Sequence, residues 1–135
     1  MPILSLKVSG PVDPVRAQEL TQAVTDLTAT ILRKKRELTA VILDVVDPAA
    51  WTVGGSTLAE QGLASFALTI KVTAGTNSRD EKAAFVNAVH GRVSAILGPL
   101  NEASYVIVEE VPADSWGYGG QTQEYRAATK AVQAA

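Results

Sequence analysis

The chain has 135 residues, of which 47% are hydrophobic and 19% charged, and its formal net charge is −2 at pH 7. This length suits one domain, and the charge provides no overall basic surface of the kind that nucleic-acid binding needs. Because the chain has no cysteine and a single histidine, its composition excludes a disulfide framework, a thiolate zinc site, an iron–sulfur cluster, a cysteine nucleophile and a metal site built on two histidines of one chain.

The first predicted elements are a strand, a helix and a second strand. Residues 2–9 alternate between apolar and polar side chains, which predicts a half-buried strand. Asp13 and Pro14 then form a helix start, and apolar residues recur at helical spacing as far as Ile31. Residues 38–46 are dense in β-branched side chains and predict the second strand.

The same order of elements recurs further along the chain. Residues 66–73 and 103–111 predict strands, and the helix between them begins after Asn77 or Ser78. The tail at residues 127–135 is rich in alanine and is compatible with a short helix over a neighbouring subunit. No apolar run approaches the roughly 18 residues that a membrane span needs, and the first residues lack a basic secretory signal. We therefore expect a cytoplasmic protein that binds neither membranes nor nucleic acid.

The chain repeats itself once, so that its second half matches its first. The segments 51–57 and 116–122 share the pattern W-x-x-G-G-x-T, whose paired glycines predict a tight hairpin turn in each copy. Residues 7–8 match 71–72, one position out of this register, which indicates a single insertion or deletion near the first turn. The prediction is a single domain in which unit one covers residues 2–60, unit two covers residues 66–126, and a tail follows.

These elements predict an α/β protein in which two tandem β-α-β units form a four-stranded sheet with two helices on one face. A helical crossover makes the two strands of each unit parallel. The other face of the sheet would be bare, so we expect oligomerisation through it. Lys7 and Asp44 occupy the same places in unit one as Lys71 and Glu109 in unit two, which predicts a cross-strand Lys–carboxylate pair in each unit.

A proline directly after the first Met at the start of a strand, a β-α-β unit and an aromatic-x-x-Gly-Gly segment resemble the tautomerase superfamily. Its members include 4-oxalocrotonate tautomerase (4-OT), malonate semialdehyde decarboxylase and macrophage migration inhibitory factor. The doubled length resembles a fused-subunit member, and residues 112–120 are most similar to the decarboxylase-like branch. The resemblance implies a tautomerase-like fold, a homotrimer with pseudo-sixfold character, a small carboxylic or oxo-acid substrate and no cofactor.

The resemblance makes Pro2 the candidate catalytic residue. Removal of Met1 would leave its nitrogen as a free secondary amine, and an α-amino group has a pKa of about 7.7–8.0, which burial lowers further. A neutral Pro2 amine would be a general base for proton transfer between carbon and oxygen, whereas a protonated one would be a general acid. The alternative is a purely structural role, in which the proline only begins a strand. Unit two begins with Phe66, so each chain has one such candidate.

The family's substrate-binding arginines are missing. In 4-OT one arginine follows the first strand and another lies in the second strand, and both bind a dicarboxylate. The matching residues here are Val12 and Ile42, with counterparts near Thr76 and at Ile107. A dicarboxylate bound in that manner is therefore not expected.

Five other residues are candidate substrate-binding residues. Trp51 and Trp116 stand where the family has an aromatic wall, or else they fill seams between subunits. Arg79 begins the second helix, and its alternative role is that of a solvated surface residue. Lys34 follows the first helix, and its alternative role is that of a cation favoured by the helix dipole. Lys71 either pairs across strands or points into the pocket.

Three functions remain open from the sequence. The favoured one is a cofactor-independent tautomerase or isomerase that moves a proton on a small 2-oxo or enol acid. A decarboxylase or a hydratase/dehalogenase with a protonated Pro2 is the second. The third is a non-catalytic oligomeric scaffold that has kept the fold and lost the activity.

Overall fold

The computed structural model describes residues 2–134, with side chains described as far as Val132. Met1, on whose removal the Pro2 chemistry depends, and the last tail residue lie outside the described residues. Unit one consists of β1 (Ile3–Ser9), α1 (Pro14–Thr30), the 3-10 turn η1 (Arg36–Leu38), β2 (Ala40–Val46), the 3-10 turn η2 (Pro48–Ala50), β3 (Thr52–Val53), β4 (Ser56–Thr57) and α2 (Leu58–Gln61). Unit two with the tail consists of β5 (Phe66–Thr73), α3 (Arg79–Leu97), β6 (Tyr105–Val111), β7 (Gly117–Tyr118), β8 (Gln121–Thr122) and α4 (Gln123–Ala134).

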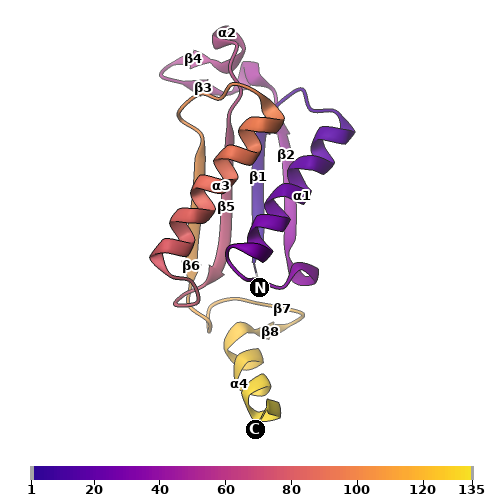
Figure 1. Cartoon of the computed structure of the whole chain (residues 1–135), viewed down its shortest axis with the longest axis vertical. Helices are drawn as coiled ribbons and strands as arrows, with labels where there is room; N and C mark the ends of the chain where they lie inside the picture. Colours follow the sequence, from indigo (N-terminus) through magenta and orange to yellow (C-terminus); the bar gives the residue numbers. More distant parts are fainter. Residues whose placement is uncertain (1, 135) are drawn as a thin grey trace.

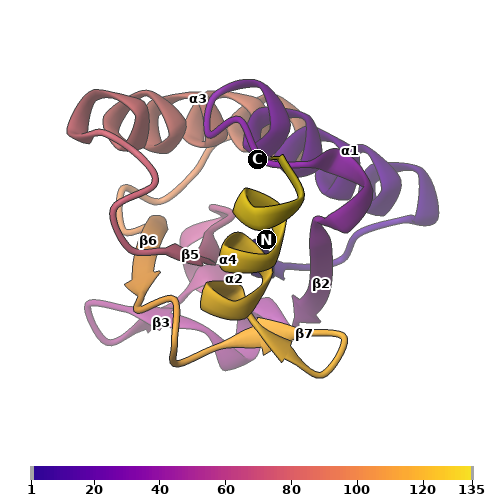
Figure 2. The same cartoon turned by 90° about the horizontal axis from the view of Figure 1, so that it is seen from below.

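The main sheet has the strand order β2-β1-β5-β6, and α1 and α3 lie side by side on one of its faces (Figures 1 and 2). β1 pairs with β2 in parallel, as does β5 with β6, and the two units join through the antiparallel pair β1–β5. The predicted four-stranded sheet with two helices on one face is confirmed. Because the central pair is antiparallel, equivalent elements of the two units lie at opposite ends of the sheet.

The alternating strand patterns place the core between the sheet and the helices. Leu4, Leu6 and Val8 are fully buried on β1, and alternate residues of β5 are buried in the same way. The helices contribute the apolar stripes that contain Val24 of α1 and Val89 of α3. Each such side chain contributes about 1.5–3 kcal/mol when it is removed from water.

Both predicted helix starts are confirmed by capping contacts. The Asp13 carboxylate accepts a hydrogen bond from the Arg16 backbone N–H at 2.8 Å. Ser78 caps α3 through a reciprocal capping box with Glu81. Strands β2 and β6 each begin two residues later than predicted, because η1 occupies residues 36–38 and the Asn101 side chain accepts a hydrogen bond from the Ala103 N–H in a turn before β6.

The pairing registers agree with the repeat in the sequence. Ile3 pairs with Ala40, and Ala67 pairs with Tyr105. The alignment that places Ala40 on Tyr105 therefore leaves the first strands of the two units shifted by one residue. The extra residue therefore lies between the first strand of unit two and its helix cap. The β3–β4 and β7–β8 hairpins follow the register of the second strands, and the glycine pairs at their turns all have positive φ.

The sheet face opposite the helices carries exposed apolar side chains. Ile42, Tyr105 and Ile107 are 59%, 59% and 48% exposed, and α4 also exposes apolar side chains beyond the sheet. On this face Lys7 lies opposite Asp44, and Lys71 lies opposite Glu109 in the same way, so the predicted registers are confirmed. The predicted ion pairs are wrong for the described residues, where neither couple is joined; these exposed groups remain solvated because water screens their attraction. Within residues 2–134 no helix has the length and apolarity that crossing a bilayer requires.

Candidate functional site

The end of the sheet where β1 begins is covered by the C-terminal hairpin and α4. The β7–β8 hairpin and α4 lie beyond this end, whereas β3, β4 and α2 lie at the other (Figure 1). Pro2 is buried, and its carbonyl accepts a hydrogen bond from the Ala40 N–H at 3.3 Å. Within one chain, the hairpin at the Pro2 end is therefore the one from unit two.

A pocket of about 260 Å³ lies between the end of α1 and this C-terminal segment. It contains five cationic side chains and no acidic one. The lining residues are Arg33, Lys34, Lys35, Leu38, Tyr118, Gln123, Arg126, Ala127 and Lys130. Leu38 stands two residues before Ala40, whose N–H donates to the Pro2 carbonyl, so the pocket lies at the Pro2 end of the sheet.

The opposite end of the molecule has a pocket that differs in charge. It has a volume of about 340 Å³ and lies between the β1–α1 turn, α2 and the end of α3. Arg16 is the one charged residue among those that line it. The two pockets occupy corresponding places in the duplicated fold, and the cations are concentrated in the one at the Pro2 end.

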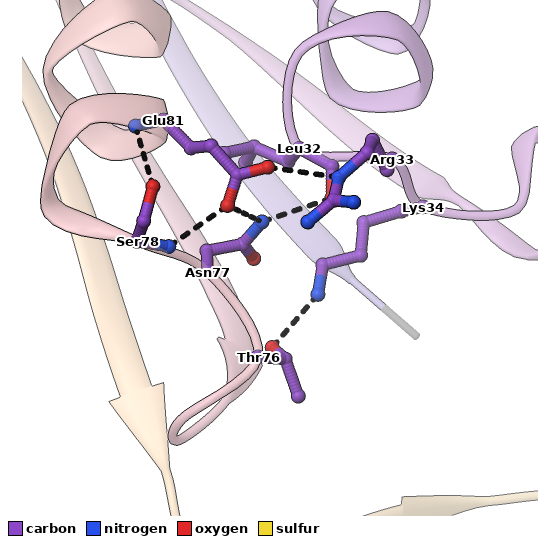
Figure 3. Close-up of polar contacts among 7 residues, drawn as sticks. All are labelled: Leu32, Arg33, Lys34, Thr76, Asn77, Ser78 and Glu81. Carbon is purple, nitrogen blue, oxygen red and sulfur yellow. Dashed lines mark hydrogen bonds and ion pairs between the residues drawn. The ribbon is translucent and has the colours of Figure 1, made fainter.

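Lys34 is held in the cationic pocket by a hydrogen bond across the two units. Its ammonium donates to the Thr76 hydroxyl at 2.8 Å (Figure 3). Burial lowers the pKa of Lys34, the charge of Glu81 raises it in opposition, and Arg33 adds to the lowering. Thr76 lies near the unit-two position that corresponds to one of the family's substrate-binding arginines. The ammonium group of Lys34, which belongs to unit one, therefore lies close to that position.

A small network fixes the turn that carries Lys34. Arg33 has a left-handed φ of 58°, and its Nε lies 2.8 Å from a Glu81 carboxylate oxygen (Figure 3). The other Glu81 oxygen accepts a hydrogen bond from the Ser78 N–H at 2.8 Å, and Asn77 donates to the Leu32 carbonyl at 3.0 Å. The Ser78 N–H bond, followed by Arg33, lowers the pKa of Glu81. The end of α1 is thus tied to the start of α3.

The predicted site residues are only partly brought together. Lys34 lines the cationic pocket. Trp116 is half-buried just before β7, and its indole N–H is buried without a partner among the described residues. Trp51 precedes β3 and lies at the far end of the same chain (Figure 1). Arg79 is exposed on the first turn of α3, and Lys71 is exposed on the open sheet face opposite Ile3, so neither lines the pocket.

Six polar residues of the pocket were missed by the sequence analysis: Arg33, Lys35, Tyr118, Gln123, Arg126 and Lys130. Four of them belong to the hairpin and α4, whose position depends on contacts between distant segments. One signal was available in the sequence. The repeat aligns Arg126 with Gln61, so unit two has a charged residue where unit one has a neutral one.

The pocket has the chemistry of an anion site. Ammonium and guanidinium groups bind carboxylates through charge-assisted hydrogen bonds. Among the described residues no group of three or more His, Asp or Glu side chains is placed to hold a metal ion. The lining of the pocket is therefore suited to an anion, and a carboxylate is one such group.

Comparison with solved structures identifies the fold. The chain resembles native fused 4-OT, with a TM-score of 0.83 and 22% identity over 93% of this chain and 98% of that one. It also resembles the wild-type fused 4-OT Q0, a symmetric trimer, with a TM-score of 0.79 and 22% identity over 90% and 96%. The protein Pt0534, in its form inactivated by 2-oxo-3-pentynoate, matches with a TM-score of 0.81 and 11% identity over 92% and 98%.

The sequence comparison points to the same group of proteins. Residues 67–126 match the family described as tautomerase enzyme. No curated protein matches the chain significantly in sequence. Unit two thus matches the tautomerase family that the sequence pattern predicted, and the whole chain has the fold of the fused 4-OT proteins.

Proposed function

We propose that this protein is a cofactor-independent tautomerase or isomerase that acts on a small 2-oxo or enol acid. The observation that carries the proposal is the concentration of cations in the pocket at the Pro2 end of the sheet and not in the pocket at the other end. In this proposal the pocket binds the substrate carboxylate, and the amine of Pro2 carries the proton. The match of residues 67–126 to the tautomerase family supports an enzyme of this kind.

The proposed proton transfer needs no metal ion. A neutral Pro2 amine accepts the proton of the enol hydroxyl as the O–H bond breaks. The resulting ammonium delivers a proton to the neighbouring carbon, where a C–H bond forms as the carbonyl appears, so the proton count is unchanged. The cations of the pocket stabilise the negative charge that develops between these steps.

The same cations favour this function over the alternatives that use a protonated proline. Positive charges close to an amine disfavour its protonated form. No acidic side chain lines the pocket to offset them. A decarboxylase or hydratase with a cationic Pro2 is therefore less well supported.

The test is ketonisation of phenylenolpyruvate and 2-hydroxymuconate by the wild type and by Pro2→Ala. General acid–base groups typically contribute factors of about 10²–10⁴ in rate, so the variant is expected to lose about 100-fold or more in kcat/KM. Urea unfolding of both proteins checks that the variant is folded. Equal activity of the two proteins would reject Pro2 as the proton carrier, and no activity of the wild type on either enol would favour the non-catalytic scaffold.

A further inference from the structure

Arg126 and the equivalent residue of unit one, Gln61, make the same contact with different side chains. In unit one the Gln61 side-chain amide donates hydrogen bonds to the carbonyls of Val53 at 3.1 Å and Ser56 at 3.2 Å. In the register that aligns the two hairpins, Gln61 corresponds to Arg126 and Val53 to Tyr118. Arg126 donates to the Tyr118 carbonyl from Nε at 3.2 Å and from Nη2 at 3.0 Å. Both residues thus tie the helix that follows a hairpin to the same carbonyl of that hairpin.

The hydrogen bond to this carbonyl does not require an arginine, because the neutral amide of Gln61 makes it in unit one. Arg126 has two further contacts. The guanidinium carbon of Arg126 lies 3.8 Å from the centre of the Tyr118 ring. Gly119 also makes room for it, since a Cβ at this position would lie 2.6 Å from Nη2, whereas a Cβ at the equivalent Gly54 would meet nothing within 4 Å. The guanidinium is therefore seated in a niche that fixes its orientation.

One side of this fixed guanidinium remains available. Nε and Nη2 bind the Tyr118 carbonyl, while Nη1 makes no hydrogen bond within residues 2–134. Each terminal nitrogen carries two N–H groups, so the edge formed by Nη1 and Nη2 still has two parallel donors. That arrangement matches the two oxygens of a carboxylate.

The surroundings of Arg126 lack a counter-charge. Among the described residues, no carboxylate forms an ion pair with Arg126, Lys34, Lys35 or Lys130, although all four line one pocket. Like charges brought together in a partly buried place disfavour one another unless an anion joins them. An anionic ligand would supply the missing charge.

We propose that Arg126 is the substrate-binding residue that replaces the missing arginines of the family pattern, and that it binds the carboxylate of a 2-oxo acid through its Nη1–Nη2 edge. The inference rests on the proposed function for the identity of the ligand. It assigns carboxylate recognition to the C-terminal helix of the chain, with Lys34 on the opposite wall of the pocket.

The test compares Arg126→Gln with Arg36→Gln. Arg126→Gln installs the residue that unit one has here, so it keeps a donor to the Tyr118 carbonyl and removes the charge. Arg36→Gln removes an equal charge from a residue that pairs with Asp26 and does not line the pocket. Pyruvate, the simplest 2-oxo acid, is the probe, and its dissociation constant is measured by calorimetry and from tryptophan fluorescence.

Arg126→Gln is expected to weaken pyruvate binding at least about tenfold, because a hydrogen bond to a charged group contributes about 1.5–3 kcal/mol. In the ketonisation assay its KM rises by a similar factor, and kcat falls by less, because the other four cations of the pocket still stabilise the developing charge. Arg36→Gln is expected to change neither, and both variants should unfold at the wild-type urea concentration. Wild-type affinity in Arg126→Gln, equal losses in both variants, or no pyruvate binding by the wild type would overturn the assignment.

The outcomes separate this inference from the proposed function. A wild type that binds pyruvate through Arg126 but ketonises no enol would retain the binding residue and reject the tautomerase. A Pro2-dependent ketonisation whose KM is indifferent to Arg126→Gln would retain the tautomerase and reject the binding residue.

Discussion

At the scale of single residues, Lys34 and Arg126 show two ways in which a cation is prepared to bind an anion. Lys34 is partly buried, which lowers its pKa, and a hydrogen bond to Thr76 holds it in place. Arg126 bears a planar guanidinium, and its orientation is fixed by Tyr118 and Gly119. The lowered pKa of Lys34 gives its contribution to binding a pH dependence.

The lowered pKa of Lys34 predicts that carboxylate affinity falls at alkaline pH. The protonated form binds the anion, and a lowered pKa means that this form is lost at a lower pH than in a solvated lysine. The affinity for pyruvate should therefore decline as the pH rises towards 10.5, the ordinary lysine value. Lys34→Arg should abolish most of this decline, and calorimetry between about pH 7 and pH 10 measures it.

Lys35→Arg is the matched control, since it makes the same change at the next position of the same pocket. It should retain the wild-type pH profile. A decline that is equally steep in the wild type and in Lys34→Arg would contradict the role of Lys34.

At the scale of elements, local patterns were sufficient to predict the main strands and helices. The alternation of residues 2–9, the Asp13 cap and the Ser78 capping box each depend on neighbours in the sequence, and all of them are present in the structure. The strand order and the antiparallel joining of β1 and β5 could not be predicted in this way, because they depend on contacts between the two units. The tail helix α4 also begins at Gln123, before the tail predicted at residues 127–135.

The open sheet face is the element with the clearest consequence for assembly. We propose that it is the interface of a homotrimer, since its apolar side chains are exposed in the single chain and a similar fused 4-OT is a symmetric trimer. Light scattering should then give three times 14.2 kDa for the wild type. Ile107→Glu should lower this mass, because it places a charge at a buried contact.

Val15→Glu supplies the control for this prediction. Val15 is 66% exposed on the first turn of α1, on the helical side of the molecule. The variant should keep the wild-type mass. A wild type with the mass of a single chain, or equal effects of the two substitutions, would contradict assembly through the sheet face.

At the scale of the whole molecule, the duplication has produced two similar ends with different chemistry. The antiparallel centre places the unit-two hairpin and α4 at the Pro2 end and the unit-one hairpin at the other. Five cations line the pocket at the first end and one lines the pocket at the second. Lys34 could be predicted as a site residue from its position after a helix. Arg126 could not be placed in the pocket from the sequence, because it reaches the pocket only when a segment of the other unit folds against it.

The proposed function depends on a reactive amine at Pro2. It is tested by the intact mass of the native protein before and after treatment with 2-oxo-3-pentynoate, the compound that inactivates the structurally similar Pt0534. We expect a native mass without Met1, one molecule of reagent added per chain, and attachment at Pro2 in the N-terminal peptide. A retained Met1, or modification at any residue other than Pro2, would contradict it.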